Sequence, residues 1–454
     1  FNEDYVFGGP ASIVTTNFGD APGPMFEDPP QCWLHKQGNF ITSFFPEGVQ
    51  FGSDYGVFYL PPKDDAYGKP MLVAGDIMTQ FNERPEVNAL MEYFTVPQSA
   101  GGWLSDGGAL AVHQTTTPDM YGQELEQNLA ALVANASSFR FDGSDLMPGE
   151  VGAGSFWTGM TDYVSGSADL DTVLPEIDAA WPEGVAGQAS ASDEEAEEPA
   201  MDDGAMAAIP GGFLEQAKNG DFAGTVVTVD GPFADNDVVR FDKSMVPFEE
   251  ATGIDVQYIG GKEFETTISV RVDAGDAPDI ADFPQPGLMA GFVEQGATVD
   301  PSTYIPQEWL EQQYNQSWLD MADVDGTMGG VWHRFNGKSL VWYPKAQFEA
   351  AGYEIPETWD DLMALSQLIA DDGDTAWCIG IESGGATGWA ATDWTEEMML
   401  RTTSLENYDA WVTGDLAFDS PEVRAAIEAW SDIWFNEDYV FGGPASIVTT
   451  NFGD

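Results

Sequence analysis

Apolar runs alternate with amphipathic stretches between residues 224 and 283. The period of the apolar positions predicts short buried strands at 224–230, 254–259 and 278–283, with helices at 235–253 and 262–274 between them. Strand, helix, strand, helix, strand is the order of a doubly wound sheet, in which parallel strands are joined by right-handed crossovers.

Ligands of doubly wound sheets bind beyond the carboxyl ends of the strands. In this chain those ends are Gly231–Asp235, Gly260–Lys262 and Phe283–Gly287. We therefore expect a binding site along these three loops.

The rest of the chain also contains both predicted helices and predicted strands. Helical patterns occur at 84–94, 122–134, 156–163, 309–321, 358–370 and 419–434, and extended apolar segments at 32–40, 55–60, 71–78, 329–343 and 377–381. The segment 329–343 is long enough to cross between two lobes. A unit of this length exceeds what one hydrophobic core usually supports, so we expect two lobes.

The first twenty residues, Phe1–Asp20, return unchanged as Phe435–Asp454. If Asp454 is taken to continue directly into Ala21, the natural order of the chain starts near 205, runs to 454 and resumes at 21. A circular permutation, a fragment of a tandem array and an assembly error between overlapping ends each explain this duplication. We expect the two copies to compete for one structural slot.

Residues 185–221 form an acidic segment that would join the natural ends in this order. Its central part, Ala189–Asp203, is small, acidic and without pattern, which predicts a disordered linker.

The charge of the chain limits its partners. With 77 Asp and Glu against 15 Lys and Arg the formal net charge is −62, so nucleic acid and anionic membrane surfaces would be repelled. No apolar run of about eighteen residues is present to cross a bilayer. No signal peptide is visible.

Residue types with special chemistry are scarce. Three histidines and two cysteines are far apart, without HExxH or CxxC spacing, and no phosphate-binding, dinucleotide-binding or nucleophile-elbow motif occurs. We therefore expect no metal, no cofactor and no catalytic residue.

Several segments carry a family resemblance. Lys338-Ser-Leu-Val-Trp-Tyr-Pro344, Glu357-Thr-Trp-Asp-Asp-Leu362 and Trp377-Cys-Ile-Gly-Ile-Glu-Ser-Gly384 resemble the extracellular solute-binding proteins of carbohydrate ABC importers. Cys32-Trp-Leu-His-Lys-Gln37 and Arg140-Phe-Asp-Gly-Ser-Asp145 are similar to the α-glucoside-binding, maltose-binding-protein-like branch of that family. The resemblance covers nearly the whole unit, in the rotated order.

This resemblance implies an α/β fold of two lobes, each a mostly parallel doubly wound sheet, with a ligand cleft between them. The expected first lobe is 222–335 with 70–118, and the expected second lobe is 336–454 with 21–69 and 119–184.

Sugars present hydroxyl groups and apolar C–H faces, so a sugar site needs carboxylates, amides and aromatic rings. The strand-end loops and the Gly-rich segment 382–394 supply these, and the family resemblance adds positions from 35 to 39, 76 and 156–157. The predicted ligand-binding residues are Asp235, Lys262, Gln285, Asn336, Glu382, Trp389, Asp393, Trp394, His35, Gln37, Asn39, Asp76, Phe156 and Trp157.

The resemblance also implies export, either to the periplasm or to the cell surface with a lipid anchor. In that oxidising setting Cys32 and Cys378 are expected to form a disulfide, the alternative being two buried thiols.

The function that follows is binding of an α-glucoside or related oligosaccharide by a monomer. The protein would close around the sugar by a hinge motion and deliver it to the permease subunits of an ABC importer. Two alternatives stay open. One is a surface-array scaffold of tandem binding domains, and the other is a glycoside hydrolase that uses paired carboxylates such as Glu382 and Asp393.

Overall fold

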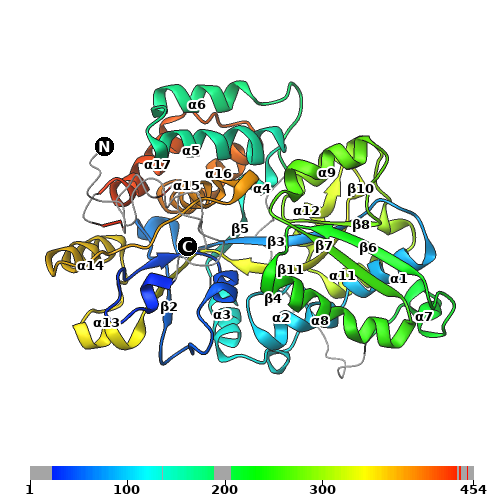
Figure 1. The fold of residues 1–454 in the computed structure, drawn as a ribbon. Coiled ribbons are helices and arrows are strands. Elements are labelled where there is room, and N and C mark those ends of the chain that lie inside the picture. Colours follow the sequence, from blue (N-terminus) through cyan, green and yellow to red (C-terminus); the bar gives the residue numbers. More distant parts are fainter. Residues whose placement is uncertain (1–22, 135, 189–205, 437–438, 441–446, 448–454) are drawn as a thin grey trace.

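The computed structural model describes residues 23–134, 136–188, 206–436, 439–440 and 447. Figure 1 shows two halves side by side, joined across the middle by long strands. We call the half around the larger sheet the large-sheet half, and the other the small-sheet half.

Within the described residues the larger sheet has seven strands in the order β4-β11-β3-β8-β6-β7, and β5 pairs with β3 outside this order. Its strands are β3 (Pro70–Gln80), β4 (Leu110–Ala111), β5 (Ser138–Phe141), β6 (Val226–Gly231), β7 (Asp255–Gly260), β8 (Ile280–Phe283) and β11 (Val331–Gly337). The pairs β6–β7 and β6–β8 are parallel, as the sequence pattern predicts. The pairs of β3 with β8 and with β11 are antiparallel, so the sheet as a whole is mixed.

β3 and β11 connect the two halves. All eleven residues of β3 are buried, because the strand is covered on both faces. Its first four residues pair with β5 and its last four pair with β8, and its middle pairs with β11. The strand therefore belongs to both halves, as Figure 1 shows.

The small-sheet half contains the three-stranded antiparallel sheet β1-β12-β2, made of His35–Lys36, Leu340–Tyr343 and Gly56–Tyr59. This pairing differs from the parallel sheet expected for each lobe, because β12 follows β11 after a short turn and meets strands that run in the opposite direction. A small antiparallel pair, β9 (Asp323–Val324) with β10 (Thr327–Met328), completes the described strands.

Helices surround both sheets. Those of the large-sheet half are α1 (Pro85–Phe94), α2 (Gly101–Asp106), α7 (Phe213–Lys218), α8 (Asp235–Thr252), α9 (Phe264–Asp273), α10 (Pro286–Glu294), α11 (Gln307–Gln313) and α12 (Gln316–Ala322). Those of the small-sheet half are α3 (Glu124–Ala134), α4 (Gly143–Leu146), α5 (Trp157–Ser165), α6 (Leu170–Ala179), α13 (Lys345–Ala351), α14 (Trp359–Asp371), α15 (Trp389–Thr402), α16 (Leu405–Val412) and α17 (Pro421–Trp434).

Local sequence signals set several of these boundaries. The Thr358 hydroxyl accepts the Asp361 N–H and the Asp361 carboxylate accepts the Thr358 N–H, so a capping box opens α14. Ser420 caps α17 with Pro421 at the first helical position. Gly253 ends α8 with a φ of 72°, a left-handed conformation that favours glycine.

Some predicted elements are wrong in detail. Of the strand expected at 32–40 only His35–Lys36 forms a strand, because a 3₁₀ turn begins at Asn39. The strand expected at 377–381 reduces to isolated bridges from Trp377 to Leu34 and Val440. The helix expected at 309–321 breaks after Gln313, because the Asn315 side chain caps a new helix.

The acidic segment 185–221 is not a linker throughout. Its described end forms helix α7, whose first N–H groups, those of Phe213 and Leu214, are accepted by the buried Glu92 carboxylate. Residues 189–205 lie outside the described residues, as does the first copy of the duplicated end. The competition between the two copies, the rotated order and the lobe boundaries therefore stay predictions.

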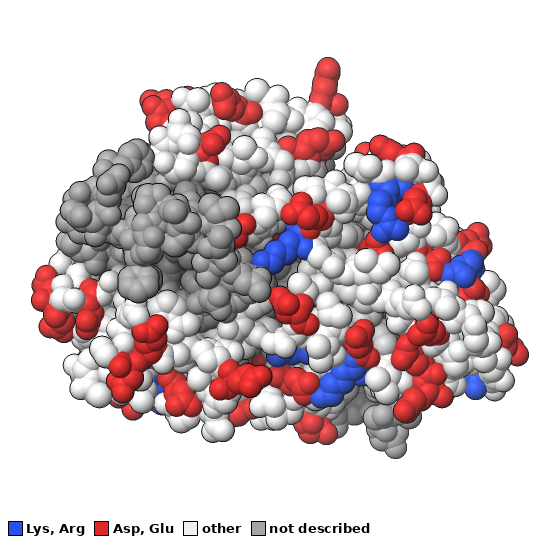
Figure 2. Space-filling model, in the orientation of Figure 1, with Lys and Arg blue, Asp and Glu red and all other residues white. Residues whose placement is uncertain are grey.

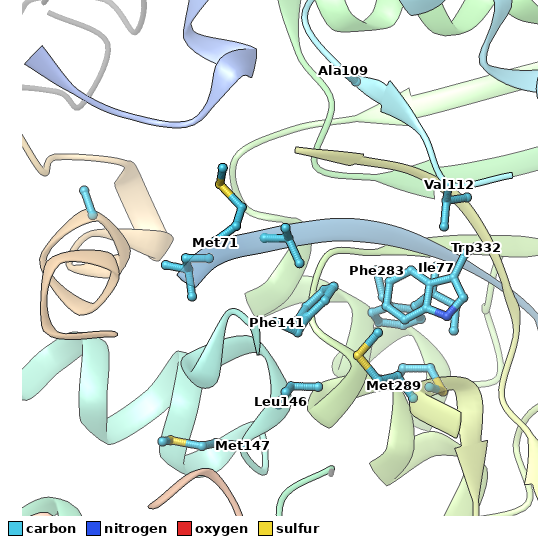
Figure 3. Close-up of a cluster of buried hydrophobic side chains, with 14 of the residues drawn as sticks. Met71, Ile77, Ala109, Val112, Phe141, Leu146, Met147, Phe283, Met289 and Trp332 are labelled. Carbon is cyan, nitrogen blue, oxygen red and sulfur yellow. The ribbon is translucent and has the colours of Figure 1, made fainter. Parts of the chain in front are cut away.

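The hydrophobic core continues across the junction between the halves. Figure 3 shows Met71 and Ile77 at separate points along β3, with Phe141 between them and with Phe283 and Trp332 beside Ile77. The Phe141 and Trp332 ring centroids are 5.3 Å apart. The site described next is therefore built on a packed junction.

The predicted disulfide between Cys32 and Cys378 is confirmed, with Cα atoms 5.5 Å apart. It fastens the chain just before β1 to the segment that follows α14.

Candidate functional site

A pocket of about 200 Å³ lies where the halves meet, and we call it the inner chamber. One wall comes from the loops after β6, β7 and β8, through Phe233, Lys262 and Gln285. This is the edge of the sheet at which the strand order predicts a site. The opposite wall comes from residues 142–157 and 383–389.

Six of the predicted ligand-binding residues line the inner chamber. They are Asp76, Trp157, Lys262, Gln285, Asn336 and Trp389. They come from both halves and from the strands that join them.

The other predicted residues lie outside the lining. Asp235 is exposed at the start of α8, and the Glu382 carboxylate accepts the Gly384 N–H at 2.7 Å. Phe156 and Trp394 are core residues, packed on Phe418 and Trp377 with ring centroids 4.8 and 5.5 Å apart.

The polar side chains around β1 form hydrogen bonds with backbone groups and do not line the chamber. His35 Nδ1 lies 2.9 Å from the Cys378 carbonyl oxygen, and burial lowers the pKa of His35 to about 4. Gln37 Oε1 accepts the Gly38 N–H, and Asn39 Oδ1 accepts the Gly337 N–H at 2.8 Å. Gly337 lies between the lining residues Asn336 and Lys338, so Asn39 holds the chain there from behind.

The floor of the chamber holds an ion-paired lysine that the sequence reasoning missed. Lys338 Nζ donates to Asp142 Oδ2, and to Asp393 Oδ1 at 2.9 Å. It also lies 5.2 Å from the ring centroid of Trp389. Burial acts to lower the pKa of Lys338, but the carboxylates of Asp142 and Asp393 raise it well above its usual value, so the ammonium stays charged.

More buried charges lie behind this floor. Carboxylate oxygens of Asp142, Asp393 and Glu396 lie within 4.8 Å of one another, close enough to hold a metal ion. The Lys338 ammonium already lies against two of them and supplies positive charge there. Lys36 adds a second ammonium 3.9 Å from Asp393 Oδ2.

A third buried cation lies on the other side of the chamber. Arg334 in β11 places its guanidinium carbon 4.3 Å and 4.6 Å from the ring centroids of Phe233 and Trp103. Its Nε lies 3.0 Å from Asp76 Oδ2. Burial raises the pKa of Asp76 to about 6, although Arg334 acts to lower it.

Several buried acceptors in the chamber have no hydrogen-bond partner among the described residues. They include Asn336 Oδ1 and Gln285 Oε1. Leaving such groups unpaired in the folded state costs about 1–3 kcal/mol each, so a ligand that carries donors gains by meeting them.

Two carboxyl groups face the chamber from opposite halves. Asp145 belongs to α4, and Glu265 to α9. Burial and the neighbouring Asp142 raise the pKa of Asp145 well above its usual value, and burial raises the pKa of Glu265 to about 7. A protonated or hydrogen-bonded carboxyl is therefore favoured at each position.

Some of the lining residues that the sequence analysis did not predict could have been recognised from the sequence. Arg334 and Lys338 are charged residues inside the long apolar run 329–343, and a charge in such a run is either exposed or paired. Asp142 and Asp145 lie in a segment used only for the resemblance. Glu265 carried no signal, because an acidic residue in the first turn of a helix usually faces solvent.

No helix among those the structure describes is long and apolar enough to pass through a bilayer.

Comparison with known proteins identifies relatives for about half of the chain. The osmoprotective compounds-binding protein GgtB of Synechocystis is 47% identical over 236 residues, which cover 52% of this chain and 56% of that protein. The alpha-glucosides-binding periplasmic protein AglE of Rhizobium meliloti is 40% identical over 251 residues, 53% of this chain and 54% of that protein. A probable sugar-binding periplasmic protein of Brucella melitensis is 30% identical over 121 residues, 26% of this chain and 27% of that protein.

The chain thus spans about half the length of the first two curated relatives. No solved structure matches it. The sequence model for bacterial extracellular solute-binding proteins matches residues 225–451, the part that carries β6 to β8, β11, Lys338 and Trp389. The fold of two halves around a chamber agrees with this match, and the chain belongs to the family of bacterial extracellular solute-binding proteins.

Proposed function

We propose that this protein binds an α-glucoside or a related small oligosaccharide outside the cytoplasm and passes it, unchanged, to the permease subunits of an ABC importer. The observation that carries the proposal is the lining of the inner chamber. Aromatic rings, amides and carboxyls from both halves converge on one small space.

This combination of groups suits a sugar. The indole rings of Trp157 and Trp389 offer apolar faces for C–H groups, while Asn336 and Gln285 offer buried acceptors for hydroxyls. The names of the relatives GgtB and AglE favour a glycoside or an osmoprotective compound as ligand.

The predicted residues outside the lining have supporting roles in this proposal. Asp393 holds Lys338 in place, and Asn39 accepts the N–H of Gly337, the residue before Lys338. The disulfide agrees with an exported location, since disulfides persist in oxidising compartments.

Binding would be linked to closure of the halves. The ligand contacts both walls, so it stabilises the arrangement in which the walls are close by its differential affinity for that state. β3 and β11 are the segments through which such a hinge would act. The protein acts as a monomer in this scheme.

Calorimetry with maltose, trehalose and sucrose tests the proposal, followed by product analysis of the same mixtures. We expect heat of binding with at least one disaccharide and no hydrolysis. Glucose release would favour the glycosidase, in which two carboxyl groups act about 5–10 Å apart. No heat with any of these sugars would favour the scaffold.

A further inference from the structure

The lining of the inner chamber contains more carboxyl groups than cations. Its carboxyl groups and its cations are Asp76, Asp142, Asp145, Asp237 and Glu265, and Lys262, Arg334 and Lys338. The ion pairs decide which of these carboxyl groups have a cation beside them.

Two of the lining cations are already paired with lining carboxylates. Arg334 Nε lies 3.0 Å from Asp76 Oδ2. Lys338 Nζ donates to Asp142 and also to Asp393, which lies behind the floor. Lys262, the third cation of the lining, is not free either.

Asp145 and Glu265 are the carboxyl groups that these pairs leave over. Asp237, the remaining one, has a cation outside the lining, since its Oδ1 lies 3.4 Å from Arg240 Nη1. No described Lys, Arg or His forms an ion pair with Asp145 or Glu265. Asp145 belongs to α4 and Glu265 to α9, so each half contributes one unpaired carboxyl group to the same small space.

A buried amide oxygen extends this surface of acceptors. Gln285 is only 4% exposed and lines the chamber, and its Oε1 has no hydrogen-bond partner among the described residues. Burial raises the pKa of Glu265 to about 7, and a hydrogen bond with Gln285 acts to lower it, so the two side chains are neighbours. A ligand group that only donates hydrogen bonds matches this surface, and an ammonium is such a group.

The ring of Trp157 offers a second attraction for a cation. Its indole N–H donates to Ser144 Oγ at 3.2 Å, which fixes a ring that lines the chamber. No described Lys or Arg lies over this ring, whereas Lys338 Nζ lies 5.2 Å from the ring centroid of Trp389. The face of an indole ring attracts a cation, and the attraction is strongest where water is excluded.

Protons reduce the charge of the chamber when no cationic ligand is bound. Burial raises the pKa of Asp145 well above its usual value, and the carboxylates of Asp142, Asp393 and Glu265 raise it further, while Lys338 acts to lower it. A buried carboxylate is stable only when it is paired. An ammonium that takes the place of these protons lets the carboxyl groups ionise and pairs them.

From this arrangement we propose that the preferred ligand of the inner chamber is an amino sugar, a glycoside whose protonated primary amine lies between Asp145 and Glu265. This inference rests on the proposed function and narrows its class of ligand. The other lining groups meet the hydroxyls and C–H faces of the sugar, and the ammonium supplies the positive charge that the lining lacks.

Calorimetry with three ligands of nearly equal size tests the inference. They are methyl α-glucoside and the two derivatives in which an amino group replaces the hydroxyl on the second or on the sixth carbon. At about pH 6.5 such amines are mostly protonated. We expect at least one amino derivative to bind wild type about tenfold or more tightly than methyl α-glucoside, because charge-assisted hydrogen bonds are roughly twice as strong as neutral ones.

Variants of the same shape test the two residues. Asp145→Asn with Glu265→Gln removes both charges, so the ratio of amino to neutral affinity should fall to within about twofold of one. Asp415→Asn with Glu250→Gln makes the same two changes at exposed positions and should keep the wild-type ratio. This control accounts for the general attraction of a cation to a chain of net charge −62. The comparison of ligands on wild type depends on no variant.

A preference of wild type below about tenfold for both amino derivatives would overturn the inference and leave the proposed function intact. The two carboxyl groups would then act as neutral partners of sugar hydroxyls. An unchanged ratio in the chamber double variant, or an equal fall in the exposed control, would also overturn it. No heat with any of the three ligands would do the same, and the titrations with maltose, trehalose and sucrose would then decide separately whether the proposed function stands.

Discussion

Lys338 shows how a single residue can organise the site. Its ammonium group is buried between Asp142 and Asp393, and its position at the end of β11 places it under the ring of Trp389. A buried charge is tolerated only when it is paired, and breaking such a pair is costly. The lysine therefore fixes the floor of the chamber beside Trp389.

Trp389 is the aromatic group whose removal should weaken binding most clearly. It lines the chamber, and its ring centroid lies 5.9 Å from that of Phe40. A stacked aromatic contributes about 0.5–1.5 kcal/mol beyond its buried area, so Trp389→Ala should weaken disaccharide binding by roughly tenfold or more. Calorimetry measures this, with Trp389→Phe as a control that retains part of the affinity. Equal affinity in wild type and Trp389→Ala would show that the ring does not contact the sugar.

Glu265 should make stability depend on pH. Burial raises its pKa from 4.5 to about 7 in the folded protein, so the folded state holds the proton more tightly than the unfolded chain. Stability from this group is complete below about pH 4.5 and is lost as the pH rises towards 7. Glu265→Gln removes the ionisation, and its advantage over wild type should grow across this window to about 1–2 kcal/mol, since the side chain keeps partial access to water.

Thermal unfolding of wild type and Glu265→Gln at about pH 4.5, 6 and 8 measures this difference. Glu250→Gln, at an exposed position of α8, serves as the control for a Glu→Gln change outside the chamber. An advantage that is the same at all three pH values would contradict the argument.

At the scale of elements, the sequence predicted the order β6, α8, β7, α9, β8 because each has a strong local period and a clear stop. The loops after these strands line the chamber for the same reason. The opposite wall was harder to predict. Asp142, Asp145 and Trp157 reach the chamber only because β5 pairs with β3, a long-range contact without a local signal.

The same reason explains the misplaced residues. Phe156 and Trp157 are neighbours on one helix turn, and only packing decides which one faces the chamber. Phe156 packs on Trp411 and Phe418, and this turns Trp157 towards the ligand side. A sequence pattern can indicate a pair of this kind but cannot choose between its members.

The disulfide should stabilise the element contacts around β1. Cys32 and Cys378 are 346 residues apart in sequence, and the Leu34 and Cys378 backbones are hydrogen-bonded beside them. Removing a native disulfide commonly costs about 2–5 kcal/mol. The double variant Cys32→Ser with Cys378→Ser should therefore unfold at a lower temperature than wild type.

Thermal unfolding with and without a reducing agent tests this expectation. The reductant should lower the unfolding temperature of wild type and leave the double variant unchanged. Wild type that unfolds at the same temperature in both conditions would mean that the bridge adds no stability.

For the whole molecule, the distribution of charge matters more than any single pair. Lys36, Arg140, Arg334, Lys338 and Arg401 are all buried, so a third of the 15 basic side chains are withdrawn from the surface. Figure 2 shows acidic groups spread over the visible face with few basic groups between them. Only twelve of the 77 Asp and Glu side chains are among the buried described residues, so the surface keeps a large negative charge.

This surface predicts that salt stabilises the folded protein near neutral pH. Like charges repel one another most in the compact state, and the screening length falls from about 10 Å at 0.1 M salt to about 3 Å at 1 M. The unfolding temperature at about pH 7.5 should rise by about 5 °C or more between 0.05 and 1 M NaCl. Calorimetric unfolding at both salt concentrations measures the rise.

The control is the same pair of measurements near pH 4.1, the isoelectric point of the sequence. The net charge is close to zero there, so screening has little repulsion to remove and the rise should shrink. An equal rise at both pH values would point to a general effect of salt on the buried surface. An unfolding temperature that does not change with salt at about pH 7.5 would mean that the acidic side chains are too far apart, or too well hydrated, to destabilise the fold.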